Sequence, residues 1–278
     1  MAKRGQYGAP TGMHAESAVP LILIAILAVF LAGKFGIIPL DNIPILNQVV
    51  PSSDVGILIF GNDPDLFQLL GSAEFQGVGG INVRPVQYQI DDTAQFLVKN
   101  PNIKVIILSG EQYCPPAFRK AVADRVRAGA SMIVIGDACT KVRGDATVIG
   151  WNVGINSLGS VMPVEIGGLS TRKQPIVTYD ASGTFRITQP DHPIFGGGPS
   201  GGQKDFAFSE QVTDVTPKAN AEVLGQIDTG YGNRNLYAII EGKSFPAGKV
   251  MYFTFNPAKT PTPLLVRNTL LYMSNKQG

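Results

Sequence analysis

Short apolar runs alternate along the chain with stretches whose apolar residues recur at helical spacing, and this alternation begins near residue 54. The runs VGILIF, KVIILS and MIVI have strand length and no regular polar positions, which is typical of strands buried on both faces of a parallel sheet. The pattern predicts strands at residues 55–60, 81–90, 104–109, 132–135 and 249–255. Pro85 lies inside the second run and favours an edge position or a bulge for that strand.

Helical segments are predicted between these strands and at the end of the chain. Asn62 or Asp63 can cap a helix whose first position is Pro64. The predicted helices cover residues 64–75, 92–99, 116–129 and 262–273. Strands that alternate with helices predict an α/β domain at 54–278, with a flavodoxin-like open parallel sheet and helices on both faces. Residues 145–190 are rich in Gly, Thr, Val and Ser, so we expect a β-rich insertion there.

The N-terminal part of the chain has a different pattern. Residues 18–33 contain no charged residue, and the apolar character continues past Lys34, which predicts one transmembrane helix at residues 17–39. A cleaved signal peptide and a buried core helix are the alternatives, but the run lacks the small residues of a cleavage site and has no polar face. A flexible polar tail is expected at 1–16 and a Pro-rich linker at 40–53.

The basic residues around the apolar segment predict its orientation. Lys3 and Arg4 precede it, whereas Lys34 is the only basic residue that follows it closely. Under the positive-inside rule, the N-terminus faces the cytoplasm and the main domain lies on the extracytoplasmic side of the cell membrane. The expected partners are therefore the lipid bilayer, through residues 17–39, and membrane proteins or further copies of the chain.

Composition excludes several functional classes. The formal net charge is +2 and the basic residues are scattered, so no nucleic-acid partner is expected. The spacing of zinc ligands is not found among the two cysteines and two histidines of the chain, which are Cys114, Cys139, His14 and His192. No metal or cofactor is therefore expected. The sequence leaves open whether Cys114 and Cys139 form a disulfide or remain as two small unpaired residues.

Several motifs recur in a recognisable order over most of residues 54–275. They are KVIILS, a helix that ends in Arg-Ala-Gly-Ala, VIGDACT, PDHPI at 190–194, and GKVMYFTFNPAKTPTPLLVRNTLLYM. In these motifs the chain resembles the class I glutamine amidotransferase-like superfamily, especially its ThuA-like (trehalose utilisation) branch. The resemblance implies the fold of that superfamily. It also indicates which positions of this sequence correspond to the family's catalytic residues.

In that family the fourth strand ends in a Gly-x-Cys-x-Gly elbow, and a later strand ends in a Phe-His-Pro-Glu-like motif that supplies a histidine and a glutamate. When the elbow is matched from Gly136, the nucleophile position falls on Ala138. The base position falls on Asn256 and the orienting acid on Ala258. The resemblance therefore implies a catalytically degenerate domain, since Asn cannot accept a proton and Ala cannot orient a base.

Two other groups of residues are candidates for chemistry. Cys139 lies one residue past the nucleophile position and would need a base, for which His192 in the Asp-His-Pro sequence is the candidate, although a turn histidine is the simpler interpretation. The second group follows the predicted strands and would meet at the carboxyl edge of the sheet as a ligand crevice; its members are Asp63, Glu111, Asp137 and Asn256. Such residues also serve as helix caps, for which Asp63 is well placed.

The sequence thus predicts a membrane-anchored, non-catalytic amidotransferase-like domain that acts as a binding or assembly module at the cell surface. Two alternatives remain open. One is a hydrolase of altered mechanism that uses Cys139 or the carboxylate crevice, and the other is a subunit of a larger membrane assembly.

Overall fold

The structure is a computed structural model of the chain, and its described residues all belong to the second of two compact units, Met1–Ser52 and Ser53–Gly278. They are 54–73, 75, 82–88, 93–100, 103–142, 144–152, 157–166, 176–196, 204–230, 235–242 and 248–274. The predicted tail, the predicted transmembrane helix at 17–39 and the linker lie outside these ranges. Within them, no helix combines the length and the apolar character that crossing a membrane requires.

One nine-stranded sheet forms the centre of the domain, in the order β10-β9-β12-β13-β14-β5-β3-β1-β2. Its strands are β1 (Asp54–Phe60), β2 (Asn82–Tyr88), β3 (Ile103–Leu108), β5 (Ser131–Ile135), β9 (Thr178–Ile187), β10 (Phe206–Thr213), β12 (Ala221–Asp228), β13 (Asn235–Gly242) and β14 (Val250–Phe253). All strand pairs from β2 to β14 are parallel. In chain order these five strands lie 2-1-3-4-5, which is the flavodoxin order. The predicted α/β class and the edge position of the strand that contains Pro85 are confirmed.

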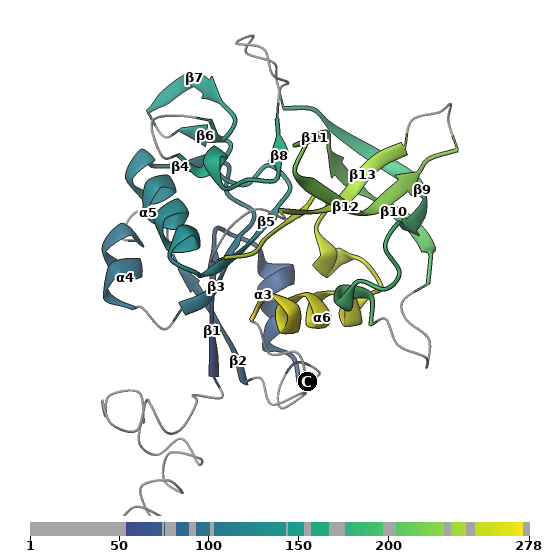
Figure 1. Cartoon of the computed structure of the whole chain (residues 1–278), viewed down its shortest axis with the longest axis horizontal. Helices are drawn as coiled ribbons and strands as arrows, with labels where there is room; N and C mark the ends of the chain where they lie inside the picture. Colours follow the sequence, from purple (N-terminus) through teal and green to yellow (C-terminus); the bar gives the residue numbers. More distant parts are fainter. Residues whose placement is uncertain are drawn as a thin grey trace, which may run out of the picture. The chain divides into compact units, whose positions relative to one another are not determined.

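The other half of the sheet is antiparallel, so the sheet is mixed and not wholly parallel as the sequence predicted. β13 pairs antiparallel with β14, and β12, β9 and β10 continue in the same manner. These strands span residues 178–242. Figure 1 shows the antiparallel strands as a curled continuation of the sheet, at the end away from β1 and β2.

Helices cover both faces of the parallel strands. They are α3 (Pro64–Gly71), α4 (Thr93–Lys99), α5 (Pro116–Arg127) and α6 (Pro263–Met273). Figure 1 shows α4 and α5 on one side of the strands and α3 and α6 on the other. Alternate residues of β5 serve the two sides, since Ile133 packs with α3 and α6 whereas Val134 packs with α5. This double burial explains why the inner strands β1, β3, β5 and β14 are apolar at nearly every position, whereas the edge strand β2 carries polar residues.

Shorter elements complete the domain. They are β4 (Tyr113–Cys114), β6 (Lys141–Val142) and β7 (Asp145–Ile149) in a three-stranded sheet, β8 (Val164–Glu165) paired with β11 (Thr216–Pro217), and the 3-10 turns η4 (Leu158–Ser160), η5 (Pro193–Phe195) and η6 (Pro257–Lys259). The strand β6 follows β5 after one turn, so the chain does not enter a helix at this point.

Candidate functional site

The loops after β1, β3 and β14 meet at Asp63, whose side chain is only 4% exposed. Its Oδ1 accepts a hydrogen bond from Leu66 N (3.0 Å) and caps α3. Its Oδ2 accepts from Asn256 Nδ2 (3.0 Å) and from Ser109 Oγ. The structure therefore brings two of the predicted crevice residues together, but it uses them to join three strand ends.

There is little room for a ligand between the first two of these loops. Gly61 has φ +107°, and a Cβ atom at this position would overlap the carbonyl group of Ser109. Gly110, on the β3 loop, has φ +71°, and a Cβ there would overlap the backbone of Asn62. Both positions require glycine because the two loops are in direct backbone contact.

The Asp63→Asn variant is expected to lower the free energy of unfolding by about 1–2 kcal/mol. Asn can still cap α3 through its oxygen, but its amide then meets the amide of Asn256, and one buried donor loses its acceptor. Urea denaturation of the full chain measures the change. The matched control is Asp65→Asn on the same helix, where the side chain is 53% exposed and the expected change is below about 0.5 kcal/mol. Equal effects of the two variants would contradict this role of Asp63.

The turn after β5, residues 136–140, carries the predicted elbow. Cys139 is the only described non-glycine residue with positive φ (55°), the backbone feature that a nucleophile elbow also shows. However, Cys139 forms a disulfide with Cys114, and both side chains are buried. Since a strand follows in place of a helix, the strand-turn-helix context of an elbow is missing.

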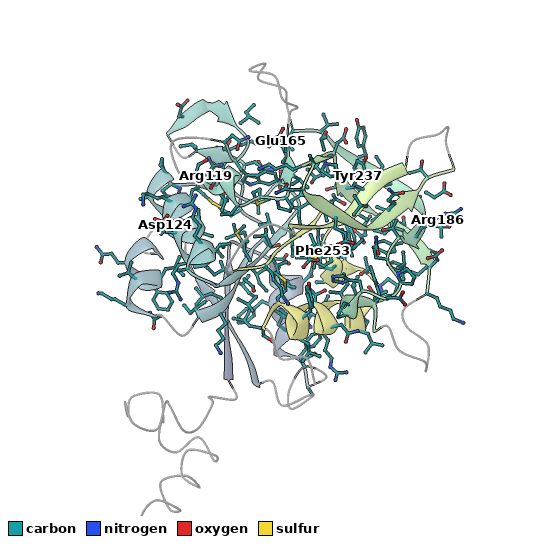
Figure 2. The ribbon with its side chains drawn as sticks, viewed as in Figure 1. Arg119, Asp124, Glu165, Arg186, Tyr237 and Phe253 are labelled. Carbon is teal, nitrogen blue, oxygen red and sulfur yellow. A yellow bond between two sulfur atoms is a disulfide. The ribbon has the colours of Figure 1, made fainter. Side chains whose placement is uncertain are left out.

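Three buried side chains from other elements bind the carbonyl groups of this turn. Arg119, on α5 (labelled in Figure 2), donates to Cys139 O through Nε (3.1 Å) and Nη2. Trp151 Nε1 donates to Ala138 O (2.9 Å), and the hydroxyl of Tyr252 donates to Gly136 O (2.8 Å). The backbone of the turn is thus fixed by the scaffold.

Burial changes the protonation equilibria of two of these side chains. It lowers the pKa of Arg119 to about 10, which leaves the guanidinium protonated at neutral pH. It also raises the pKa of the Tyr252 hydroxyl, with a further contribution from the negative charge of Asp137. Both side chains therefore act at neutral pH as hydrogen-bond donors to the turn.

Of the other two predicted crevice residues, Asp137 lies in the same turn and Glu111 lies beside it. Asp137 Oδ2 accepts from Gln112 Nε2, and Gln112 Oε1 accepts from Lys141 Nζ (2.5 Å). Burial raises the pKa of Asp137, opposed by its backbone hydrogen bond, by Lys141 and by Gln112. Glu111 Oε1 accepts from Tyr113 N (2.8 Å). In the described ranges, no three His, Cys, Asp or Glu side chains are arranged to hold a metal ion.

His192 lies in a separate cluster. Its Nε2 is 3.1 Å from Glu241 Oε2, and its Nδ1 accepts from Ile194 N (3.4 Å), so both ring nitrogens have partners. Ile194, two residues after His192, belongs to the core on the α3 and α6 side of the sheet, whereas Cys139 belongs to the core on the α5 side. The structure therefore does not bring Cys139 and His192 together.

A groove lies next to the Asp63 cluster, with a volume of about 790 Å³. Its lining comes from one side of α3, from η6 and from Glu210 on β10, and comprises Asp65, Gln68, Leu69, Ser72, Ala73, Glu210, Ala258 and Lys259. Sequence reasoning did not identify Glu210, because nothing in the pattern placed β10 beside the first helix. The one signal available for Glu210 is that it lies on a strand whose residues alternate between buried and exposed positions.

The sequence matches no known family profile and no curated protein. Solved structures are similar to it in fold. The Cytoplasmic Protein STM3548 from Salmonella typhimurium has a TM-score of 0.53 at 14% identity, over 79% of this chain and 99% of that one. A putative ThuA-like protein from Bacteroides uniformis has a TM-score of 0.53 at 13% identity, over 80% and 91%.

A third similar structure is beta-galactosidase from Bacillus circulans sp. alkalophilus, with a TM-score of 0.50 and 13% identity over 79% of this chain and 30% of that one. These likenesses concern the fold alone, because all identities are low. They support an α/β domain with a ThuA-like fold, in agreement with the strand order.

Proposed function

We propose that the domain is a non-catalytic binding or assembly module built on an amidotransferase-like scaffold. The observation that carries this proposal is the chemistry at the positions where the family places its catalytic groups. Ala138 occupies the nucleophile position, and the thiol next to it, Cys139, is consumed in a disulfide. A disulfide sulfur lacks the thiolate that attacks a carbonyl group.

The base and acid positions support the same proposal. Asn256 donates through Nδ2 to Asp63, and its Oδ1 accepts from Ala258 N (3.0 Å). Both ends of this amide are therefore occupied in holding the loop, and an amide does not accept a proton at neutral pH. Ala258 has no group that could orient a base.

One observation favours the alternative of a hydrolase with an altered mechanism. Asp137 is a partly buried carboxylate in the turn after β5, and burial raises its pKa. Perturbed carboxylates are frequent at catalytic sites. This alternative uses the carboxylate and not the disulfide-bonded Cys139. It predicts hydrolytic turnover, whereas the non-catalytic module predicts none.

We further propose that residues 17–39 anchor the chain in the cell membrane, with the N-terminus in the cytoplasm and the domain outside. The disulfide Cys114–Cys139 is compatible with this location, because structural disulfides persist in oxidising compartments. Assembly with membrane proteins or with further copies of the chain is part of the proposal, through the apolar linker at 40–53.

The purified full chain in detergent is expected to hydrolyse none of glutamine, simple amides or glycosides above the rate of buffer. Turnover at ordinary enzyme rates, about 1–1000 s⁻¹, would overturn the proposed function. Loss of such turnover in Asp137→Asn, with retention in Cys139→Ala, would assign it to the carboxylate. Particle size after extraction tests assembly, since a particle of monomer size counts against it.

A further inference from the structure

We propose that the outer edge of β10, together with the groove beside it, binds an extended peptide segment that carries a basic side chain. This inference rests on the proposed function, because it names the kind of partner that the binding module holds. The groove of about 790 Å³ is lined by residues of α3 and its C-terminal end, by η6, and by Glu210 of β10. Strand addition of a peptide requires an exposed strand edge, and a groove beside that edge can receive alternate side chains of the peptide.

The outer edge of β10 is free to pair. β10 ends the nine-stranded sheet, and across the described part of the chain no strand lies against its outer side. Its eight residues pair with β9 without a register shift and include no Pro, Gly, Lys or Arg. Natural edge strands are usually protected by such residues or by bulges, and β2, at the opposite edge, contains Pro85. β10 therefore presents a regular pairing edge whose one charged residue is Glu210. A charge at an edge disfavours indiscriminate pairing, and this one would select a basic partner.

The hydrogen bonds around β10 show which backbone groups face outward. The N–H of Asp214 donates to Val177 O (2.9 Å), on the β9 side. Backbone groups alternate in direction along a strand, so the odd-numbered residues direct theirs away from β9. The groups available to a partner strand are those of Ala207, Ser209 and Gln211.

One end of this available edge is closed. The N–H of Thr213 also faces outward, but it already donates to Thr254 O (2.8 Å). A partner strand can therefore pair with residues 207–211 and not beyond them. The site suits a short extended segment of about five residues.

Glu210 gives this edge a preference for a ligand side chain of positive charge. Its side chain is half-buried in the groove wall, and in the described part of the molecule it makes no ion pair or side-chain hydrogen bond. The cation in the lining, Lys259, lies 3.8 Å from Asp65 and compensates that carboxylate. The negative charge of Glu210 is left uncompensated and favours a basic ligand side chain.

The register of an added strand would place the basic side chain of the ligand directly opposite Glu210. If the ligand strand pairs antiparallel to β10, Ser209 and Gln211 exchange hydrogen bonds with it, and Glu210 lies in a non-hydrogen-bonded pair, where opposite side chains are closest. The ligand residues two positions away on either side share this face. Leu69, Ala73 and Ala258 in the groove lining favour aliphatic side chains there.

A fluorescein-labelled peptide, Val-Thr-Lys-Thr-Val with blocked ends, is the probe for this site. Anisotropy titration with the full chain in detergent is expected to show saturable binding below about 1 mM. Glu210→Gln, and separately a peptide with Glu in place of Lys, should each weaken binding at least about fivefold. The matched control is Asp124→Asn on α5, an exposed carboxylate on the other side of the sheet, which should leave binding unchanged.

A second pair of probes tests strand pairing itself. Methylation of the two Thr amide nitrogens removes the donors that face β10 and should abolish binding. Methylation of the Lys amide, which faces away, should have little effect. Ser209→Pro removes an outward N–H without touching the β9 ladder and should also abolish binding, with folding checked by circular dichroism.

The negative results for the peptide site can be distinguished from those for the proposed function. Absence of saturable binding, equal binding of the Lys and Glu peptides, or equal binding of the two methylated peptides would overturn the peptide site. None of these results bears on hydrolysis, so the proposed non-catalytic function would stand. Hydrolytic turnover by the full chain would overturn the proposed function whatever the peptide result.

Discussion

The Arg119→Met variant is expected to unfold with a free energy about 3 kcal/mol lower than that of the unchanged protein. The Arg119 side chain is 1% exposed and is among the largest fully buried side chains of the described residues. Its Nη2 donates to Cys139 O and to Gly150 O (2.6 Å). Methionine fills a similar volume but donates no hydrogen bond, so these carbonyl groups lose the donor that Arg119 provides.

Two effects of opposite sign decide the size of this change. Removing the charge recovers part of the desolvation penalty, which is visible in the pKa of about 10. Each buried acceptor left without a donor costs about 1–3 kcal/mol. With two carbonyl groups affected, one in the turn and one directly after β7, the loss of donors outweighs the recovered solvation, and the net change is destabilising.

Urea denaturation of the full chain tests this expectation, with Arg127→Met as the control. Arg127 lies on the same helix but forms exposed contacts, with Asp124 Oδ1 at 2.8 Å, and should change stability by less than about 1 kcal/mol. If the two variants lose equal stability, the hydrogen bonds of Arg119 do not hold the turn as described.

The parallel half of the fold could be predicted from the sequence because its signal is local. The strands β1, β3, β5 and β14 are short, largely apolar runs, whereas the edge strand β2 contains Arg84 and Pro85. The helix α3 begins at the expected cap Asp63 with Pro64 in its first turn. The antiparallel half could not be predicted, because strands such as β10 alternate buried and exposed residues, and their pairing depends on long-range contacts. Intrinsic strand preference does not specify which strands become neighbours.

The candidate site was predictable in its position but not in its contacts. The expectation that strand ends gather Asp63 and Asn256 at one edge follows from topology alone, and the two side chains are 3.0 Å apart. The sequence could not show that their polar atoms are used by the scaffold. It also could not show that Glu210, far along the chain, reaches a groove beside the first helix, because that contact depends on the curl of the antiparallel strands.

The second large effect concerns the disulfide. The Cys114→Ala/Cys139→Ala double variant is expected to lose about 3 kcal/mol of unfolding free energy, because the crosslink closes a loop with a sequence separation of 25 and restricts the unfolded chain. Urea denaturation without reductant measures the loss. Dithiothreitol should lower the stability of the unchanged protein to a similar value and leave the double variant unaffected. Equal stability of the unchanged protein with and without reductant would contradict the prediction.

A matched variant separates the crosslink from the backbone conformation at the same residue. Cys139 has φ 55°, a region that is unfavourable for residues with a Cβ atom and accessible to glycine. The Cys114→Ala/Cys139→Gly variant should therefore be about 1 kcal/mol more stable than the double alanine variant, although both lack the disulfide. Identical stabilities would mean that the turn relaxes once the bond is gone although Arg119 is still present, and hence that the disulfide imposes the conformation of the turn.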